Sequence, residues 1–559
     1  MYFDVMITVK SPDNRRVMRT AFAAVLLLPA LAAADTYPRQ AGVDAIHYVF
    51  RLSLGDASDE LTGRATVTVK FVADDVREVV LDLTSAADGK GMTVQSVTHQ
   101  LHPPNPPHQP LPFIHDNHRL RITLPAAARA GQEFSFTVAY SGVPGAGIHI
   151  GPNIHGERAM FSDSWPNNAR QWLPAIDHPY DKATGEFIVT APNHYQVVSN
   201  GLLVEEIDLP GNQRRTHWRQ SVPIASWLHA LGVARFSSHH AGTVRGIPLQ
   251  TWVFPQNRDG GIALFEDLSR RALTFFIDRV GPYSYEKLAN VQAVGISGGM
   301  ELASAIFYGE KDVAAGRGPV VHEIAHQWFG NAVTERDWDD VWLSEGFATY
   351  FTLLFTEHDE GRDAFVEGLK RSRDQVFALT QKLPEAPIVH RNLDDMRRVL
   401  SGLIYQKGGW VLHMLRAEVG TEHFWTAIRE YYRRYQDLNA STADLQAVFE
   451  QVSGKDLDWF FTQWLTRPGL PRLEGTWRYD AAARQVEVTL TQSQAADAFR
   501  LTVDVGLTAV AGGLPRTERV AMTAKRATMR FDAATEPAAV VIDPGTWALF
   551  EPGPFTKAK

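Results

Sequence analysis

Residues 321–350 read VHEIAHQWFGNAVTERDWDDVWLSEGFATY and hold the most informative pattern in the chain. His322, Glu323 and His326 form an H-E-x-x-H motif within a helical apolar pattern. Residues four apart lie on one helix face, so both imidazoles can reach the same metal ion. Glu323 lies near enough to that face to hold a water on the metal and take its proton. The motif therefore predicts a catalytic zinc site, and a buried, metal-free histidine pair is the alternative.

A third metal ligand is needed, because catalytic zinc sites use three protein ligands and keep a fourth position for water. Glu345, with eighteen residues between it and His326, is the candidate. The segment Val341–Tyr350 reads as a second helix with apolar positions around Glu345. A carboxylate inside an apolar run is costly to bury unless it is paired or bound to a metal, which favours Glu345 as a ligand.

These residues also resemble the gluzincin aminopeptidases of the M1 family, whose motif is H-E-x-x-H, eighteen residues, then E. Two further segments resemble family motifs, G-x-M-E-N upstream and Y-x-K-G downstream: Gly298-Gly299-Met300-Glu301-Leu302 and Tyr405-Gln406-Lys407-Gly408. The order and spacing fit from about Tyr37 to the end of the chain. The resemblance implies a zinc-dependent aminopeptidase with one zinc ion per chain, held by His322, His326 and Glu345, and peptide substrates with a free N-terminus.

The resemblance also implies roles for individual residues. Glu301 would bind the substrate's free α-amino group, and a carboxylate near the zinc is suited to pair with an ammonium. Gly298, Gly299 and Met300 would line the substrate site beside it, since glycines allow close backbone approach. Tyr405 would donate a hydrogen bond to the oxyanion. The alternatives are a merely structural Glu301 and a packing role for Tyr405.

Two positions depart from the family pattern. Leu302 replaces the asparagine of G-x-M-E-N, a polar group expected to contact the substrate backbone. Trp165 stands where a glutamine lines the substrate pocket, four residues before Ala169-Arg170, and core packing is its alternative role. The acidic cluster Asp337, Asp339 and Asp340 is expected to be a solvated turn, although one member could orient a zinc histidine.

The composition is that of an ordinary soluble enzyme. The chain has 559 residues, 45% of them hydrophobic and 21% charged, which suggests two to four domains. The net charge is -8 and no basic patch suggests nucleic acid. There is no cysteine, so any metal must rest on His, Asp or Glu.

Residues 1–34 are predicted to be an upstream segment plus a signal peptide. Met18-Arg19 precedes the apolar run Ala21–Ala33, and alanines near position 34 offer a cleavage site. The run is too short for a stable membrane anchor. We expect a start at Met18, a periplasmic or secreted protein and no integral membrane segment in the mature chain. A buried N-terminal helix is the alternative.

The rest of the chain predicts an α+β multidomain fold. Alternating segments indicate an N-terminal all-β domain over 35–236. Residues 237–468 turn mainly helical, with helices expected at Ala263–Val280 and Met396–Val419, and resemble a thermolysin-like catalytic domain. Residues 469–559 alternate again and predict a C-terminal β-sandwich. Many relatives carry a large helical C-terminal domain that caps the active site. Such a domain does not fit in the residues that remain here, so we expect a more open cleft.

The leading hypothesis is a zinc aminopeptidase in which Glu323 activates water for hydrolysis of N-terminal residues. One alternative is a non-catalytic peptide-binding relative that keeps the M1 fold. The other is an M1 hydrolase with a second, non-peptide activity, which no residue specifically supports.

Overall fold

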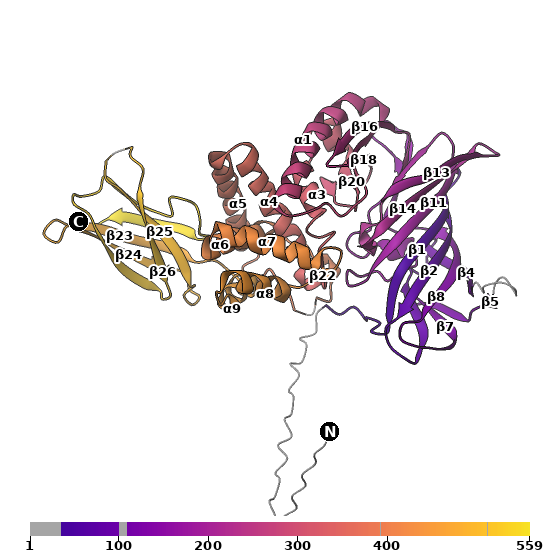
Figure 1. The fold of residues 1–559 in the computed structure, drawn as a ribbon, viewed down its shortest axis with the longest axis horizontal. Helices are drawn as coiled ribbons and strands as arrows, with labels where there is room; N and C mark the ends of the chain where they lie inside the picture. The colour runs from indigo at the N-terminus through magenta and orange to yellow at the C-terminus, as the bar shows by residue number, and fades with distance from the viewer. Residues whose placement is uncertain (1–34, 100–108, 392, 511, 559) are drawn as a thin grey trace, which may run out of the picture.

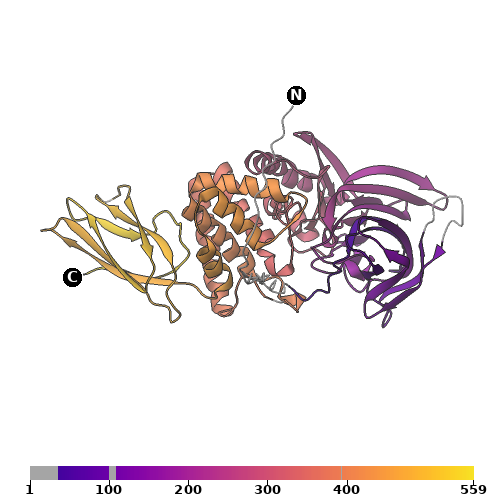
Figure 2. The ribbon, with the colours of Figure 1, turned by 60° about the horizontal axis from the view of Figure 1, so that its bottom comes forward.

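The structure is a computed structural model and describes residues 35–559 apart from 100–108, 392, 511 and 559. Three parts follow one another along the long axis: β-rich, mainly helical, then β-rich again (Figure 1). The same order is seen after rotation (Figure 2). This arrangement agrees with the predicted multidomain α+β fold. The predicted signal peptide lies outside the described residues.

The N-terminal part is built from strands that alternate buried and exposed residues, as expected where one sheet face is covered. In the strand Leu61–Phe71, for example, Ala65, Val67 and Val69 are fully buried. The strands are β1 (Val43–Ser53), β2 (Leu61–Phe71), β3 (Val76–Asp82), β4 (Gly91–His99), β5 (Gln109–Pro110), β6 (Phe113–Asp116), β7 (Arg119–Ala128), β8 (Glu133–Val143), β9 (Ile148–Pro152), β10 (Arg158–Ser162), β11 (Lys182–Pro192), β12 (Gln196–Ser199), β13 (Leu202–Leu209), β14 (Gln213–Ala225) and β15 (Leu231–Ala234).

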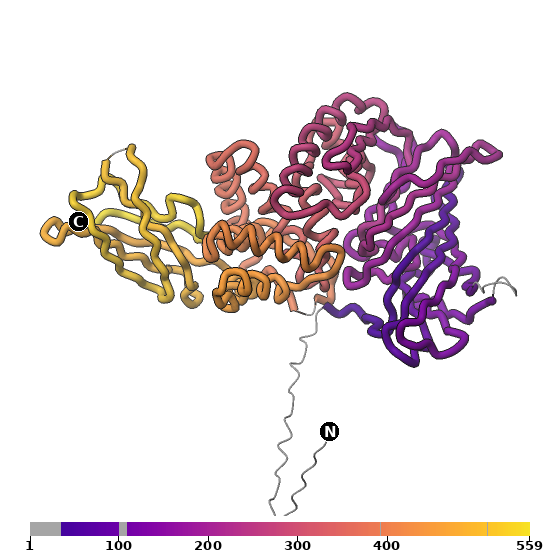
Figure 3. The backbone as a smooth tube through the Cα atoms, viewed as in Figure 1, coloured from indigo at the N-terminus to yellow at the C-terminus, as the bar shows by residue number. Residues whose placement is uncertain are grey.

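Among the described residues, these strands form a large sheet and two smaller ones. The large sheet has the order β13-β14-β11-β1-β2-β8-β4-β5, and β2 pairs antiparallel with β8, Ala65 lying opposite Val138. The smaller sheets have the orders β12-β15-β10-β9 and β3-β7-β6. The segment before β1 first runs along the helical part (Figure 3), where Thr36 N donates to Leu393 O at 3.2 Å.

The middle part combines a small sheet with helices. Its strands are β16 (Ser237–Val244), β17 (Ile247–Val253), β18 (Leu288–Ala293), β19 (Gly299–Met300), β20 (Ala305–Gly309), β21 (Thr334–Glu335) and β22 (Asn439–Ala440). Its helices are α1 (Arg258–Arg279), α2 (Glu310–Ala314), α3 (Val320–His326), α4 (Trp342–Asp359), α5 (Arg362–Lys382), α6 (Gly402–Val419), α7 (Thr421–Tyr435), α8 (Thr442–Ser453) and α9 (Asp458–Phe461).

The sheet of the middle part has the order β16-β17-β18-β20-β19. Strands β17, β18 and β20 are parallel, whereas β19 pairs antiparallel with β20, Met300 lying opposite Phe307. The glycine-containing segment at 298–300 therefore forms an edge of the sheet, in contact with α3.

Helix α4 packs against both α3 and α6. The ring of Phe329, just after α3, lies 4.5 Å from that of Phe347 and 4.7 Å from that of Phe351, which fixes the end of α3 against α4. Helices α4 and α6 cross where a Cβ atom on Gly346 would lie only 3.0 Å from the backbone of Gly408. Two glycines thus permit an unusually close helix crossing beside Glu345.

The helix expected over Met396–Val419 is shorter than predicted. Residues Met396–Arg398 form a separate 3-10 turn, stabilised by the Asp395 side chain accepting from Arg397 N. Ser401 has an extended backbone, with φ -139° and ψ 152°, and α6 begins only after it. The helical prediction was wrong for residues 396–401, because a local side-chain cap competes with helix continuation there.

The C-terminal part contains two sheets with the orders β27-β24-β23-β29 and β26-β25-β28 among the described residues. Its strands are β23 (Arg472–Asp480), β24 (Gln485–Gln492), β25 (Leu501–Thr508), β26 (Arg516–Met522), β27 (Arg526–Asp532), β28 (Ala539–Ile542) and β29 (Glu551–Lys557). No helix in the described part of the chain is both long and apolar enough to cross a membrane.

His413 of α6 joins the helical part to the C-terminal part. Its Nε2–H donates to Thr546 O at 2.8 Å, its Nδ1 accepts from the Tyr350 hydroxyl at 3.0 Å, and its ring stacks on Trp547 with centroids 4.7 Å apart. Burial lowers the pKa of His413 to about 3, so this interface contains a neutral imidazole.

Candidate functional site

The structure brings together the three residues predicted to bind a metal. The Nε2 atoms of His322 and His326 lie 3.1 Å apart, and each lies 3.3 Å from Glu345 Oε2. A tetrahedral zinc ion about 2.0–2.1 Å from each ligand atom requires those atoms to be about 3.3 Å apart. The two nitrogens and one oxygen therefore fit zinc in chemistry and in spacing, and they leave one coordination position free.

Helix geometry places both histidines, and one backbone and one side-chain contact orient His326. His322 and His326 are one turn apart on α3, and Glu345 enters from the first turn of α4. His326 Nδ1 lies 3.1 Å from Phe329 O and 3.0 Å from Ser344 Oγ. A hydrogen bond from Nδ1–H to the carbonyl oxygen leaves Nε2 as the ligand atom. The sequence interpretation missed Ser344. Its position directly before Glu345 was the only sequence feature that could have indicated a role at this site.

The acidic cluster does not have the predicted role. Asp339 and Asp340 are buried, Asp339 Oδ1 accepts from Leu393 N, and Asp340 accepts from both Thr442 N and Thr442 Oγ1. These carboxylates hold neighbouring segments of the fold, so the expected solvated turn was wrong. The groups on His326 Nδ1 are Phe329 O and Ser344 Oγ instead.

Tyr405 reaches the metal site because α4 and α6 approach closely at Gly346 and Gly408. Its hydroxyl donates to Glu345 Oε1 at 3.0 Å, which leaves Oε2 of the same carboxylate to face the histidines. Burial and the neighbouring Glu345 raise the pKa of Tyr405 well above its ordinary value, so the hydroxyl remains a donor. Lys407 anchors the same helix by donating to Arg467 O and Gly469 O, both at 3.3 Å.

The carboxylate of Glu323 lies directly over the backbone of Gly299. A Cβ atom on Gly299 would be 2.4 Å from Glu323 Cδ and Oε1, which is closer than any real contact. Glu323 Oε2 is buried and makes no hydrogen bond within the described residues. Burial, followed by the charge of Glu301, raises the pKa of Glu323 well above its ordinary value. The edge strand β19 thus leaves room for a desolvated carboxylate beside the metal ligands.

Glu301 follows β19 and is held through its own backbone. Its carbonyl oxygen accepts from Gln327 Nε2 at 2.9 Å and from Asn331 Nδ2 at 2.6 Å. Burial raises the pKa of the Glu301 carboxyl to about 7. Gln327 and Asn331 were missed by the sequence interpretation, although Gln327 directly follows the H-E-x-x-H motif and Asn331 lies four residues further on.

Lys182 of β11 supports the same loop from the N-terminal part. Its half-buried ammonium donates to Asn331 O and Ala332 O, both at 3.0 Å, and to Leu438 O at 3.3 Å. Burial lowers the pKa of Lys182 to about 7. Lys182 thus connects the N-terminal sheet to the loop that contains Asn331 and to the segment before β22.

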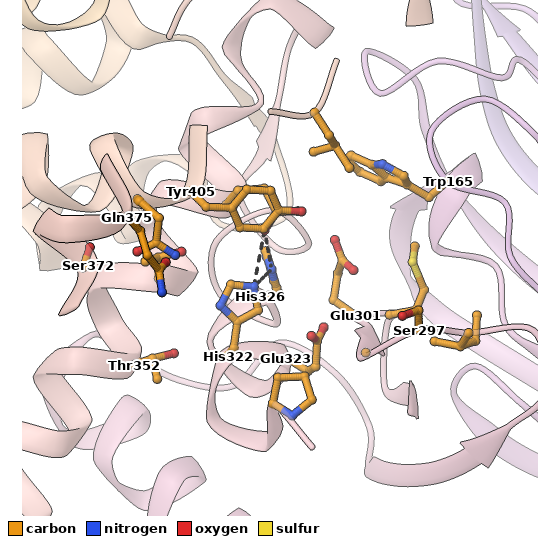
Figure 4. A pocket seen from close by; sticks show the side chains of 18 of the residues that line it. Trp165, Ser297, Glu301, His322, Glu323, His326, Thr352, Ser372, Gln375 and Tyr405 are labelled. Atoms are coloured by element: carbon orange, nitrogen blue, oxygen red, sulfur yellow. Dashed lines mark hydrogen bonds and ion pairs between the residues drawn. The ribbon is translucent and has the colours of Figure 1, made fainter. Parts of the chain in front are cut away.

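A cavity of about 720 Å³ surrounds these residues. In Figure 4, Glu301, Ser297 and Trp165 lie to one side of His322 and His326, and Thr352, Ser372 and Gln375 lie to the other. Gly299, Met300, Glu323, Glu345 and Tyr405 also line it, whereas Gly298 does not. Apart from Gly298, the structure therefore gathers the sequence-predicted residues around one space.

The two departures from the family pattern have different positions. Trp165 lines the cavity and also packs edge-on against Trp227 and Trp338, with centroids 4.6 Å and 4.9 Å away. The pocket role and the packing role predicted as alternatives are therefore combined. Leu302 is fully buried and does not line the cavity, so its side chain faces the protein core.

Two family models match the chain: the Peptidase M1 N-terminal domain over residues 44–228 and the Peptidase family M1 domain over residues 267–464. Together these ranges cover more than half of the sequence. The chain belongs to the M1 peptidase family, which confirms the family predicted from the motifs and, with it, the expected class of zinc metallopeptidase.

Curated relatives and solved structures agree with this assignment. Human glutamyl aminopeptidase is 29% identical over 339 residues, covering 56% of this chain and 34% of the relative. Probable aminopeptidase 1 of Saccharolobus solfataricus is 27% identical, covering 58% and 43%. The matched region is thus less than half of each relative. The M1 zinc metallopeptidase structure from Deinococcus radiodurans has a TM-score of 0.66 at 25% identity, covering 77% of this chain and 95% of that one.

Proposed function

We propose that this protein is a zinc-dependent aminopeptidase that removes N-terminal residues from peptides. The observation that carries the proposal is the buried carboxylate of Glu301, which shares one cavity with His322, His326 and Glu345. A carboxylate near the hydrolytic centre suits the ammonium group of a free N-terminus. Two related M1 zinc metallopeptidase structures contain L-tryptophan and a Tyr-Ser-Ala substrate, which supports the same substrate class.

His322, His326 and Glu345 would hold the zinc ion. A bound zinc polarises the scissile carbonyl and lowers the pKa of water. Glu323 takes a proton from the attacking water on its carboxylate and passes it to the leaving amine. Tyr405 donates its hydroxyl proton in a hydrogen bond to the developing oxyanion. Glu301 binds the α-amino group, with Gly298, Gly299 and Met300 forming the adjoining wall.

The test uses aminoacyl-p-nitroanilides and their N-acetylated counterparts. Wild-type protein should cleave the free substrates and leave the acetylated ones intact. Glu323→Gln should abolish release while zinc remains bound, and Glu301→Gln should reduce the preference for the free N-terminus. Glu335→Gln is the matched control, because this buried glutamate does not line the cavity. Equal cleavage of free and acetylated substrates would reject the aminopeptidase proposal.

The finer organisation is also part of the proposal. We propose domains at 35–236, 237–468 and 469–559, with the last a β-sandwich built from the two C-terminal sheets. We further propose that residues 1–34 include a cleaved signal peptide and that the mature protein is periplasmic or secreted. Mass spectrometry of the native N-terminus tests this, since a mature chain that retains Met1 would contradict it.

A further inference from the structure

The cavity continues past the metal ligands, away from Glu301. Along α4, Glu345 is followed by Thr349, Thr352 and Leu353 on the same lining face. Helix α5 completes this end of the cavity with Gly368, Arg371, Ser372 and Gln375. We call this region the α5 end, and the region of Asp163, Trp165 and Glu301 the Glu301 end. The two lie on opposite sides of the histidines (Figure 4).

Arg371 is the only lysine or arginine among the described residues that line the cavity. Within the part of the chain that the structure describes, its exposed guanidinium makes no hydrogen bond or ion pair. It folds back over Gly368, where an added Cβ atom would lie 3.9 Å from Arg371 Nη2. Glu367, one turn earlier on the same helix, feels the charge of Arg371 but forms its ion pair with Lys370, at 2.7 Å. Arg371 therefore presents at the α5 end a guanidinium that has no hydrogen-bonded partner among the described residues.

The Glu301 end has the opposite charge. Glu301 and Asp163 both line it, and no lysine or arginine of the described cavity residues lies with them. A cavity with carboxylates at one end and a guanidinium at the other complements a short zwitterionic peptide, which carries an ammonium and a carboxylate at its two ends.

We propose that Arg371 binds the C-terminal carboxylate of the substrate, and that the enzyme prefers peptides of three or four residues. This inference rests on the proposed aminopeptidase function. The planar guanidinium is suited to bind a carboxylate through two parallel hydrogen bonds. Arg371 would therefore select substrates by their length and by the presence of a free C-terminal carboxylate.

The rise along α4 supports this substrate length. Thr352 is seven residues beyond Glu345 on α4, a rise of about 10 Å at 1.5 Å per residue. An extended peptide advances about 3.5 Å per residue, so two or three residues beyond the scissile bond span about 7–10 Å. The terminal carboxylate of a tripeptide or tetrapeptide then comes to the level of the α5 end. The carboxylate of a hexapeptide lies beyond it.

The experiment compares kcat/KM for Ala-Ala-Ala with that for Ala-Ala-Ala-NH2 in wild type, Arg371→Gln and Lys370→Gln. Lys370 is the adjacent cation on α5 that does not line the cavity, which makes it the matched control. We expect wild type to favour the free acid by about tenfold, the size of one charge-assisted hydrogen bond. The ratio should fall toward one in Arg371→Gln and stay at the wild-type value in Lys370→Gln.

Two further substrates distinguish a failure of the proposed role of Arg371 from a failure of the proposed aminopeptidase function. A hexapeptide and its amide should be cleaved with a ratio near one in all three proteins. Alanyl-p-nitroanilide reports the underlying aminopeptidase activity, so its cleavage together with a tripeptide ratio of one would overturn only the role of Arg371. No cleavage of the anilide would reject the proposed function itself. A ratio unchanged by Arg371→Gln would also overturn the inference.

Discussion

Replacing Gly299 by alanine should disable the site while leaving the fold and the metal ligands in place. The added Cβ atom would lie 2.4 Å from Glu323 Cδ and Oε1, whereas ordinary contacts begin at 3.4 Å. The atoms in the way are the end of a flexible side chain, so the Glu323 carboxylate, rather than the backbone, must move. The required displacement is about 1 Å.

A shift of this size has a large kinetic effect and a small structural one. Misplacing a catalytic group by about 1 Å can cost about a hundredfold in rate. That factor corresponds to about 2.7 kcal/mol of transition-state stabilisation. We therefore expect kcat on an aminoacyl-p-nitroanilide to fall about a hundredfold in Gly299→Ala, with little change in the melting temperature.

The assay measures kcat, zinc content by elemental analysis and thermal unfolding on the same samples. Gly318→Ala is the control, because its Cβ atom would make only an ordinary contact, 3.6 Å from Tyr308 Cδ1. A Gly299→Ala protein with full zinc content and wild-type kcat would refute the argument that this glycine makes room for Glu323.

Three further outcomes are expected. Tyr405→Phe should lower kcat by about 100- to 1000-fold with zinc retained, and unchanged kcat would contradict the oxyanion role. Ser344→Ala removes the hydroxyl 3.0 Å from His326 Nδ1 and should weaken zinc retention about tenfold in a chelator competition; equal retention would show that Phe329 O suffices. For His413, the folded pKa of about 3 lies below its ordinary 6.5, so the unfolded chain takes up the proton first. Its stability contribution is present above pH 6.5 and is lost as the pH falls toward 3, so melting temperature should decline more steeply in wild type than in His413→Asn.

The candidate metal-binding group could be predicted because its arrangement follows from local geometry. His322 and His326 share a face of any helix, and Glu345 stands out as a carboxylate within an apolar helix. Strand alternation likewise predicted the β-rich character of both ends of the chain. Roles for Glu301 and Tyr405 came from the family resemblance, and the structure places both side chains at the cavity.

Other features depend on packing between distant segments and could not be read locally. Asp340 has the composition of a solvated turn, yet its partner Thr442 is 102 residues away. The guanidinium of Arg371 becomes meaningful only once α5 is folded against α4. Local polarity does not reveal whether a distant residue will supply a partner, which explains why the acidic cluster was misinterpreted.

The contacts of Lys182 imply that the mainly helical part of the molecule is not an independent module. The Lys182 ammonium, supplied by the N-terminal sheet, donates to two carbonyls of the loop that carries Asn331 and to Leu438 O. A fragment starting near residue 237 would lose this ammonium and leave Ala332 O without its donor, whereas Asn331 O still accepts from Thr334 Oγ1 and Leu438 O from Thr334 N. The two larger parts should accordingly melt in one calorimetric transition, and transplanting the helical part alone into another scaffold would require a substitute cation at this position.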